Sequence, residues 1–256
     1  MIDLLKFFEN DKYRKLALFG KNLYKKNKPF PHIFFDNFLP RKIALDLAKD
    51  FPKLSKINNK KWRVHKNDNV IRYFVEDSSQ FNKNLKLFSM VINSRKFLLF
   101  LETLTGIKSI IPDPFFMGGG AMLTGKGGFL NVHADFNFHH KLQSWRRLNV
   151  LFYLTPSWKS SWKGNLEFWS KNKKKKIKQI EPKFNRVVIF NTTSLSFHGQ
   201  PEPINCPKYI SRNVFSAFYY SPFRDKNTSK DPHFTKYDIK NNPYAKNIIK
   251  DYKKNY

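Results

Sequence analysis

The sequence predicts a mainly β fold with α-helices: a sandwich or barrel of short strands with a helical layer on one side. Two observations carry this prediction. Apolar residues recur at helical spacing within the first 105 residues, and from about residue 110 short strand-like segments alternate with Gly, Pro, Asn and Ser. At 256 residues, 41% of them hydrophobic, the chain can bury a sizeable core, and we expect one domain.

The first part of the chain predicts helices around two strand-like segments. In order, we expect an amphipathic helix over 1–27, an aromatic strand within 29–40, a helix that closes before Pro52, a strand-like segment over 62–78 and a second helical region over 84–105. The first helix is expected to be an N-terminal appendage covering residues 1–28.

The second part predicts regular short strands. We expect them over 115–122, 127–132, 147–154, 166–169, 186–190 and 212–220. Residues 223–256 form a basic, polar tail that we expect to be extended or weakly helical. The strands therefore set a barrel core over about 110–222.

The formal net charge of +29 is consistent with an anionic partner. It is also consistent with an A/T-rich genome, which favours Lys, Asn, Ile and Phe, and the chain is rich in all four. Only ten of the 48 basic residues are Arg, the side chain suited to bidentate phosphate recognition. Nucleic acid is therefore not the expected partner. The lysine run over 171–178 is expected to be a solvated hairpin or loop.

The single cysteine, Cys206, excludes an intrachain disulfide framework and a zinc site built on paired cysteines. It is compatible with a reducing cytoplasm, where we expect the protein. The N-terminus lacks the basic start and long apolar region of a signal peptide, and no run of about 18 apolar residues predicts a transmembrane segment.

The pattern that carries chemistry is His133-Ala134-Asp135. On a strand, residues two apart project from the same face, so this imidazole and this carboxylate can share one metal ion. His198, which follows the strand expected over 186–190, is the third candidate ligand. Two histidines and one carboxylate with the other positions open form the arrangement of non-haem iron(II) oxygenases.

Arg212 opens the strand expected over 212–220, and alternation along this strand places its guanidinium on the same face as Val214, Ser216, Phe218 and Tyr220. A buried guanidinium needs an anionic partner, and the carboxylate of a ligand would bind it through two hydrogen bonds. The alternative is an Arg at the edge of a strand that pairs with an acid of the protein.

With these residues in this order, the chain resembles the iron(II)- and 2-oxoglutarate-dependent dioxygenases, in the branch similar to the catalytic domain of prolyl 4-hydroxylases. The resemblance covers about residues 110–222, with 29–52 similar to the lead-in of such proteins. Blocks that agree in order are Gly127-Gly128-Phe129-Leu130, His133-Ala134-Asp135, Leu148–Thr155 with Trp158, Gly164–Trp169, Asn185–Thr192, His198-Gly199 and Arg212.

The resemblance implies a double-stranded β-helix, a jelly-roll, cupin-like barrel, as the core of a dioxygenase domain over 29–222. It implies His133, Asp135 and His198 as catalytic iron ligands. For 2-oxoglutarate it implies Arg212 and Tyr153, with Asn149 and Leu151 on the face of Tyr153 and Ser216 nearby. Its cofactors would be iron(II), 2-oxoglutarate as cosubstrate and O2, and ascorbate by family resemblance. Because Asp135 is a carboxylate, hydroxylation rather than halogenation is expected.

One departure concerns the cosubstrate. The family often has a tyrosine ahead of the glycine turn, where this chain has Leu123 and Thr124, so Thr124 is the candidate for that hydrogen bond. His139 and His140 are expected on a solvated or substrate-contacting loop.

The primary substrate stays open among a peptidyl proline, a free amino acid, a sugar and a lipid intermediate, with an anionic leaning suggested by the net charge. Two other functions stay open: a non-catalytic basic jelly-roll binding protein, and a nucleic-acid demethylase of the alkylation-repair type. Those demethylases carry a second Arg six residues after the cosubstrate Arg, where this chain has Phe218.

Overall fold

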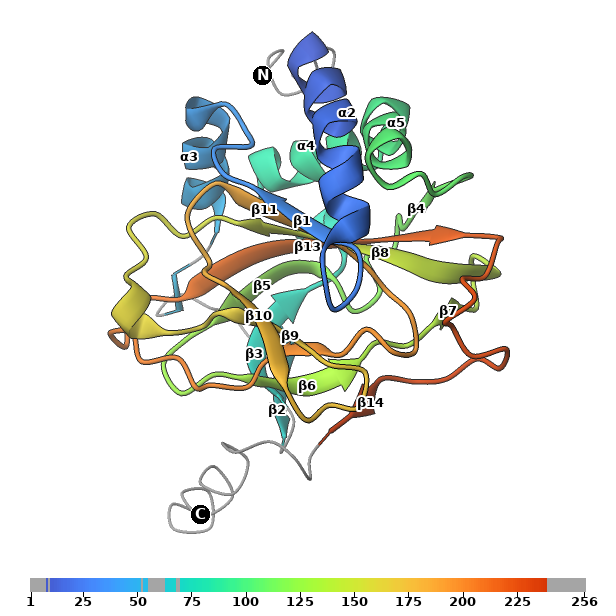
Figure 1. The fold of residues 1–256 in the computed structure, drawn as a ribbon. Coiled ribbons are helices and arrows are strands. Elements are labelled where there is room, and N and C mark those ends of the chain that lie inside the picture. Colours follow the sequence, from blue (N-terminus) through green and yellow to red (C-terminus); the bar gives the residue numbers. More distant parts are fainter. Residues whose placement is uncertain (1–7, 9, 52, 55–62, 68–69, 239–256) are drawn as a thin grey trace.

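We analysed a computed structural model, which describes residues 8, 10–51, 53–54, 63–67 and 70–238. Its β-strands form one curled sheet (Figure 1), in the order β1-β11-β8-β13-β5-β3-β6-β12-β9-β10, with β2, β4, β7 and β14 attached to its members. The strands are β1 (His32–Phe35), β2 (Arg63–Asn67), β3 (Val70–Val75), β4 (Ile111–Pro112), β5 (Gly120–Thr124), β6 (Leu130–Ala134), β7 (Phe138–His139), β8 (Ser144–Tyr153), β9 (Leu166–Trp169), β10 (Lys176–Ile180), β11 (Arg186–Asn191), β12 (His198–Gln200), β13 (Arg212–Ser221) and β14 (Lys236–Tyr237).

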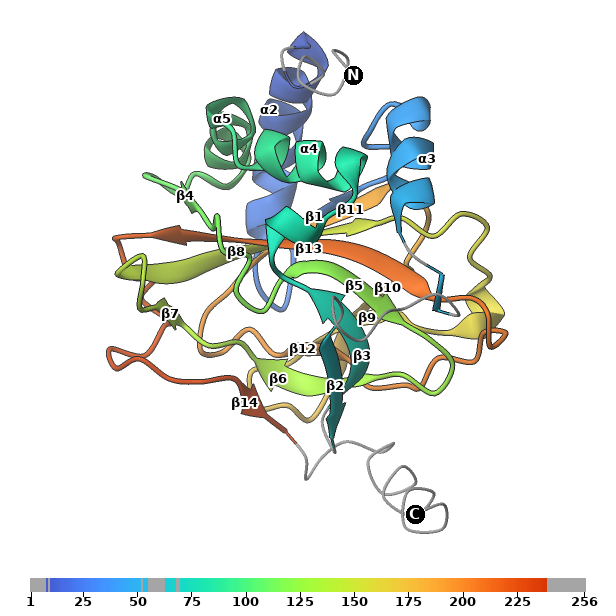
Figure 2. The same ribbon diagram turned by 180° about the vertical axis from the view of Figure 1, so that it is seen from behind.

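Helices cover one outer face of this sheet (Figures 1 and 2). The α-helices are α2 (Asp11–Lys26), α3 (Arg41–Asp50), α4 (Lys83–Ile92) and α5 (Arg95–Thr105), and 3-10 turns occupy Ser78–Gln80 and Ser160–Trp162. Asn10 caps α2 by accepting a hydrogen bond from the Lys12 backbone N–H, and α5 ends at Gly106, which adopts the left-handed conformation. The prediction of a mainly β barrel flanked by N-terminal helices is confirmed.

The strands alternate between two interiors. On β8, Leu148, Val150 and Phe152 pack into the large core beneath the helices, while Tyr153 packs into a second cluster inside the curl of the sheet. Because side chains alternate along a strand, each central strand separates a helix-facing core from a barrel-facing interior. That barrel interior is where the functional residues lie.

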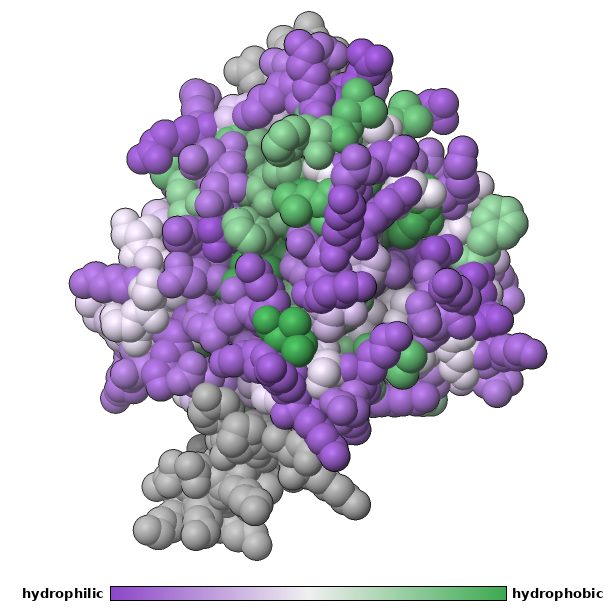
Figure 3. Space-filling view, in the orientation of Figure 1, coloured by the Kyte–Doolittle hydropathy of each residue, from purple (hydrophilic) through white to green (hydrophobic). Residues whose placement is uncertain are grey.

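The helix α2 belongs to the large core. Its buried face includes Tyr13, Ala17 and Tyr24, and the Tyr13 hydroxyl donates to the Phe38 carbonyl at 2.8 Å. Residues 11–26 are therefore packed against the rest of the fold, and a domain boundary at residue 28 stays a prediction. The opposite face of the helix leaves Leu18, Phe19 and Leu23 exposed, and Figure 3 shows hydrophobic side chains gathered around α2 on an otherwise largely hydrophilic surface.

Several predicted elements have shifted boundaries. The helical region expected over 84–105 is two helices separated at Asn93 and Ser94, and the strand expected over 115–122 begins only at Gly120. Residues before Gly120 form a loop held by the Asp113 carboxylate, which accepts the backbone N–H of Phe115 at 2.8 Å and of Met117 at 2.9 Å. This side-chain-to-backbone bonding competes with strand pairing.

The lysine run forms an exposed hairpin between β9 and β10, as expected. The described part of the C-terminal tail, through residue 238, runs along the barrel and pairs as β14 with β6. The remainder of the predicted tail, 239–256, lies outside the described residues. None of the helices in the described part of the chain combines the length and apolar character that a bilayer crossing requires.

Candidate functional site

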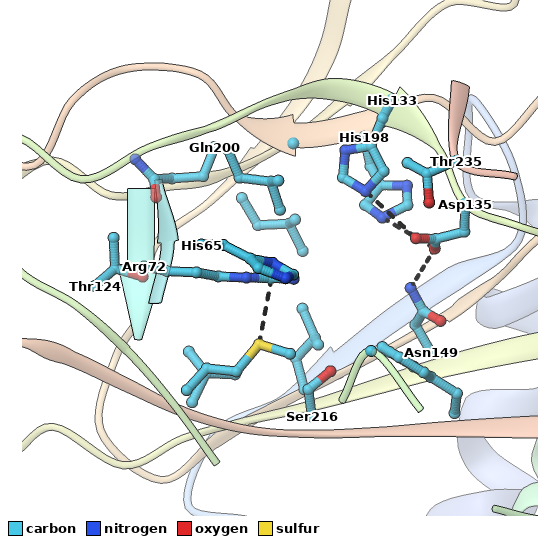
Figure 4. A pocket seen from close by; sticks show the side chains of 18 of the residues that line it. His65, Arg72, Thr124, His133, Asp135, Asn149, His198, Gln200, Ser216 and Thr235 are labelled. Atoms are coloured by element: carbon cyan, nitrogen blue, oxygen red, sulfur yellow. Dashed lines mark hydrogen bonds and ion pairs between the residues drawn. The ribbon is translucent and has the colours of Figure 1, made fainter. Parts of the chain in front are cut away.

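A cavity of about 200 Å³ opens into the barrel interior. It brings together every site residue expected from the sequence: His133, Asp135, His198, Arg212, Tyr153, Asn149, Leu151, Thr124 and Ser216. Figure 4 shows His133, His198 and Asp135 at one end of this cavity, and Arg72, Thr124 and Gln200 extending from the other. Strands far apart in the sequence therefore converge on one pocket.

Strand pairing places the two histidines beside each other. His133 lies on β6 and His198 on β12, and the two residues face each other in the antiparallel register, with ring centroids 4.5 Å apart. Gly199 permits this close approach, because a Cβ there would lie 2.9 Å from the carbonyl oxygens of Leu130 and Asn131. The geometry of the pair is thus set by the backbone.

Each imidazole is oriented by the backbone carbonyl two residues before it in the chain. Nδ1 of His133 lies 2.7 Å from the Asn131 carbonyl oxygen, and Nδ1 of His198 lies 2.9 Å from that of Ser196. Since a carbonyl only accepts, Nδ1 carries the proton that is donated, which leaves Nε2 of each neutral ring with a free lone pair. Those lone pairs are what a metal ion needs.

The carboxylate of Asp135 completes the group. Oδ1 lies 3.4 Å from Nε2 of His133, and Oδ2 lies 3.4 Å from Nε2 of His198. One ligand atom from each of the three residues lies within 4.8 Å of the others. Two neutral imidazoles and one carboxylate can therefore bind one face of a metal ion and leave its other coordination positions open. Non-haem iron(II) oxygenases use this ligand set, so the residues fit iron(II).

The protonation states also suit a cation. Burial lowers the pKa of His198 to about 4, so the ring is neutral at pH 7. Burial alone would raise the pKa of the Asp135 carboxyl, but the positive charge of Arg146, with His198 and His133, outweighs it and holds the pKa well below its usual range. No proton needs to leave either group when a cation binds at neutral pH.

A second layer of side chains holds Asp135. Asn149 donates from Nδ2 to Oδ2 of Asp135 at 2.9 Å, and Nη2 of Arg146 lies 3.1 Å from the same oxygen. Arg146 also donates from Nε and Nη2 to the Asn149 Oδ1, and its guanidinium stacks on Phe218 at 3.5 Å and on Phe136 at 4.5 Å from the ring centroids. This buried network fixes the carboxylate that faces the histidines.

Arg212 lies in the same cavity on β13, paired in register with Thr124 of β5. Among the described residues its one side-chain hydrogen bond is from Nη1 to the Gly164 carbonyl at 2.6 Å, and its Nε is buried without a partner. Burial lowers the pKa of this guanidinium, and Tyr153 is the neighbour that opposes the effect. The alternative of a strand-edge Arg paired with an acid is therefore not what the structure shows, and a ligand carboxylate fits the open donors.

Sequence reasoning missed several residues that line the cavity: His65, Arg72, Met122, Arg146, Gln200, Phe218, Thr235 and Tyr237. Arg146 was not predicted, because strict alternation along the strand from Asn149 places the side chain of Arg147, not that of Arg146, in the cavity. A β-bulge opposite Tyr219 and Tyr220 shifts the register and turns Arg146 inward. Arg72 lies on β3, outside all of the motif blocks, so no spacing signal pointed to it.

The expectation of a solvated loop is wrong for His139. This residue lies on β7 with its side chain fully buried, its Nε2 3.6 Å from the Asp113 carboxylate and its ring 5.0 Å from that of Tyr220. Asp113 and Tyr220 come from distant segments, so the local sequence could not show this contact. His140, its neighbour, is exposed as expected.

Comparisons with known proteins agree with this geometry. The family model of the 2OG-Fe(II) oxygenase superfamily matches residues 119–220. Prolyl 3-hydroxylase OGFOD1 from Mus musculus is 27% identical over 103 residues, which cover 39% of this chain and 18% of that relative. The chain thus matches less than a fifth of the length of that curated relative.

Solved structures share the fold at low identity. A prolyl hydroxylase from Trichoplax adhaerens, in complex with a hypoxia inducible factor oxygen degradation domain peptide, aligns with a TM-score of 0.54 at 18% identity, covering 86% of this chain and 96% of that one. A prolyl-4-hydroxylase from Pseudomonas putida aligns with a TM-score of 0.55 at 14% identity, covering 80% and 99%. Residues 119–220 therefore match the 2OG-Fe(II) oxygenase superfamily, and the chain has a fold like that of the prolyl hydroxylases.

Proposed function

We propose that this protein is an iron(II)- and 2-oxoglutarate-dependent hydroxylase. One observation carries the proposal: a single cavity holds the ligand set His133, Asp135 and His198 together with the guanidinium of Arg212, which has no acidic partner among the described residues. The first suits a divalent metal with open positions, and the second suits the distal carboxylate of a 2-oxo dicarboxylic acid.

In this proposal the chain supplies three metal ligands in a fixed arrangement. Nε2 of His133, Nε2 of His198 and one oxygen of Asp135 bind the ion, while the Nδ1–H donors anchor both rings to backbone carbonyls. Asn149 and Arg146 hold the other side of the carboxylate, so that its orientation is set before the ion arrives.

The cosubstrate lies between the ligands and Arg212. Arg212 binds the distal carboxylate, with Tyr153 beside it, the hydroxyl of Thr124 on the neighbouring strand β5 and that of Ser216 further along β13. Asn149 and Leu151 form part of the wall. When bound, iron(II), 2-oxoglutarate and O2 supply chemistry in which one oxygen atom enters a substrate C–H bond as a hydroxyl and the other enters succinate, with release of CO2.

The first substrate class to test is a prolyl residue in a peptide. Support comes from the similar proteins, which are a prolyl 3-hydroxylase and two prolyl hydroxylases, one of them in complex with a peptide. We further propose a reducing compartment such as the cytoplasm, supported by Cys206, a buried free thiol.

The decisive experiment starts with protein purified anaerobically and loaded with iron(II). Succinate formed from 2-oxoglutarate is measured with and without a panel of proline-containing peptides, and hydroxylated products are identified by mass spectrometry. His133→Ala and His198→Ala should each abolish metal binding. Wild-type protein that binds neither metal nor 2-oxoglutarate would contradict the proposal.

Arg212→Gln separates cosubstrate binding from metal binding. The substitution removes a charge-assisted, two-pronged hydrogen bond, so the Kd for 2-oxoglutarate should rise by about 10- to 100-fold. Manganese(II) affinity in the absence of 2-oxoglutarate should stay within about twofold of wild type. Calorimetric titrations of each ligand measure both values, and an unchanged Kd for 2-oxoglutarate would remove Arg212 from the proposed role.

A further inference from the structure

A second guanidinium without an acid partner lies in the same cavity. Arg72 is on β3, which pairs with β2 over residues 70–74, with β5 over Tyr73–Val75 and with β6 at Val70. Its Nη1 donates to the Met122 sulfur at 3.4 Å, a weak acceptor, and its Nε is shielded from solvent with no partner. Figure 4 shows the side chain extending into the cavity toward the end that holds His198 and Asp135.

This arrangement is costly for the free protein. Burial lowers the pKa of the Arg72 guanidinium, and no described carboxylate lies within ion-pair distance of it. Tyr237 and Asp135 oppose this lowering of the pKa, but the Tyr237 hydroxyl is neutral because burial raises its own pKa, and Asp135 is already engaged by Arg146 and the histidines. Removing a charge from water without a paired acid is unfavourable, so a half-buried Arg72 that has no acid partner among the described residues is better explained by a ligand than by folding.

The charge balance of the site with iron(II) and 2-oxoglutarate bound also leaves Arg72 without a partner. Iron(II) and Arg212 together carry three positive charges, and Asp135 and 2-oxoglutarate carry three negative ones, so this set is neutral. Arg146 adds one positive charge but is stacked between two phenylalanine rings and hydrogen-bonded to Asn149. Arg72 then stays as an uncompensated cation after the cosubstrate is in place.

We propose that Arg72 binds a carboxylate of the primary substrate and thereby selects substrates that carry one close to the carbon to be hydroxylated. The inference rests on the proposed function. A planar guanidinium matches a carboxylate through two parallel hydrogen bonds, and Nε together with a terminal nitrogen provides that pair. Because two strands flank β3, Arg72 is held on a rigid support.

Both carboxylates of 2-oxoglutarate have other partners in the proposed complex, the metal and Arg212. The carboxylate on Arg72 therefore comes from the second reactant. In a peptide it is an Asp or Glu side chain next to the target proline, and in a free amino acid it is the α-carboxylate. These two sources share one chemistry and are separated by the substrates tested below.

The first test measures anion binding without turnover. Protein loaded with manganese(II) and saturated with 2-oxoglutarate is titrated with [13C]acetate, and the paramagnetic relaxation of the carboxylate carbon is followed by NMR. Wild type should give saturable relaxation enhancement, Arg72→Gln should reduce it about tenfold, and Arg72→Lys should retain part of it. Arg95→Gln, which removes the same charge from an exposed site on α5, should match wild type.

The outcomes separate the two proposals. If Arg72→Gln leaves acetate relaxation unchanged, or raises the Kd for 2-oxoglutarate as much as Arg212→Gln does, the inference fails while the oxygenase proposal stands. If inorganic phosphate, followed by 31P relaxation, depends on Arg72 and acetate does not, the carboxylate assignment is overturned. Loss of manganese or 2-oxoglutarate binding in wild type overturns both proposals.

The second test uses matched substrates. Peptides with Asp beside the proline are compared with the same peptides carrying Asn, and free proline is compared with prolinamide. With wild type, the acidic member of one pair should give about tenfold higher kcat/KM, and with Arg72→Gln the members should be equal. The pair that shows the preference identifies the source of the carboxylate, and no preference in either pair argues against the inference.

Discussion

Arg146 shows how a single side chain can substitute for an absent cation. Its guanidinium lies 3.1 Å from Oδ2 of Asp135, and Arg146 is buried while the Asp135 side chain is 12% exposed. When the metal is absent, this contact keeps the carboxylate ionised and in place. When the metal is present, the carboxylate has two positive neighbours, so the contribution of Arg146 to stability becomes smaller.

A residue-scale prediction follows for Arg146→Met. Leaving Asp135 buried without its charge partner should lower the free energy of unfolding of the metal-free protein by about 3 kcal/mol. Manganese(II) should restore more stability to this variant than it adds to wild type. Urea denaturation with and without the ion measures both effects.

The control is Arg186→Met, which breaks the Arg186 pair with Asp36 (Nε to Oδ1, 2.6 Å), outside the cavity. Its loss of stability should be the same with or without manganese(II). Equal metal responses in the two variants would show that Arg146 does not act on the metal site.

At the scale of elements, the metal ligands depend on the contact between β6 and β12. Gly199 lies on β12, and Gly199→Ala would place a methyl group 2.9 Å from two carbonyl oxygens of β6. The strands must separate by a few tenths of an ångström, which moves His198 away from His133. We expect manganese affinity to fall at least tenfold while the fold is retained.

Gly106→Ala is the matched control for that change. Gly106 ends α5 at a φ of +76°, so alanine there should cost about 1 kcal/mol of stability through backbone strain. Because Gly106 is outside the cavity, manganese affinity should not change. Calorimetric titration compares the two variants, and equal affinities would mean that the strand contact does not set the ligand geometry.

The elements also show what the sequence could and could not predict. Alternation along β8 and β13 correctly grouped Asn149, Tyr153 and Arg212 on the barrel face, because the two strands pair in regular register over that stretch. The same alternation gave the wrong face for Arg146, because a β-bulge in β8 interrupts the two-residue period there. It also could not show that Arg72 and Tyr237 join the cavity, since β3 and β14 reach β6 through long-range pairing that leaves no local pattern.

At the scale of the whole molecule, stability should depend on pH near neutrality. Burial lowers the pKa values of His32, His139, His198 and His233, whose ordinary value is 6.5. As pH falls below 6.5, the unfolded chain therefore takes up protons that the folded chain resists, and the folded state loses stability. For His198 the loss continues down to about pH 4.

We expect the unfolding free energy of metal-free protein to fall steadily from pH 7.5 to 5.5. Each such histidine can contribute a slope of up to about 1.4 kcal/mol per pH unit. His32→Phe should make the slope shallower, since the ring lies against Phe168 and phenylalanine fits that surrounding. Urea titrations at a series of pH values test this, and a flat profile in wild type would contradict it.

The pairing of β14 with β6 has a consequence for biosynthesis. Tyr237 lies against His133, at a ring distance of 5.4 Å, and with Thr235 it lines the cavity. During translation the three candidate ligands are joined to the chain by residue 198, whereas this wall is added only with residues 235–237. A chain that ended after β13 would therefore keep all three candidate ligands but would lack this wall of the cavity.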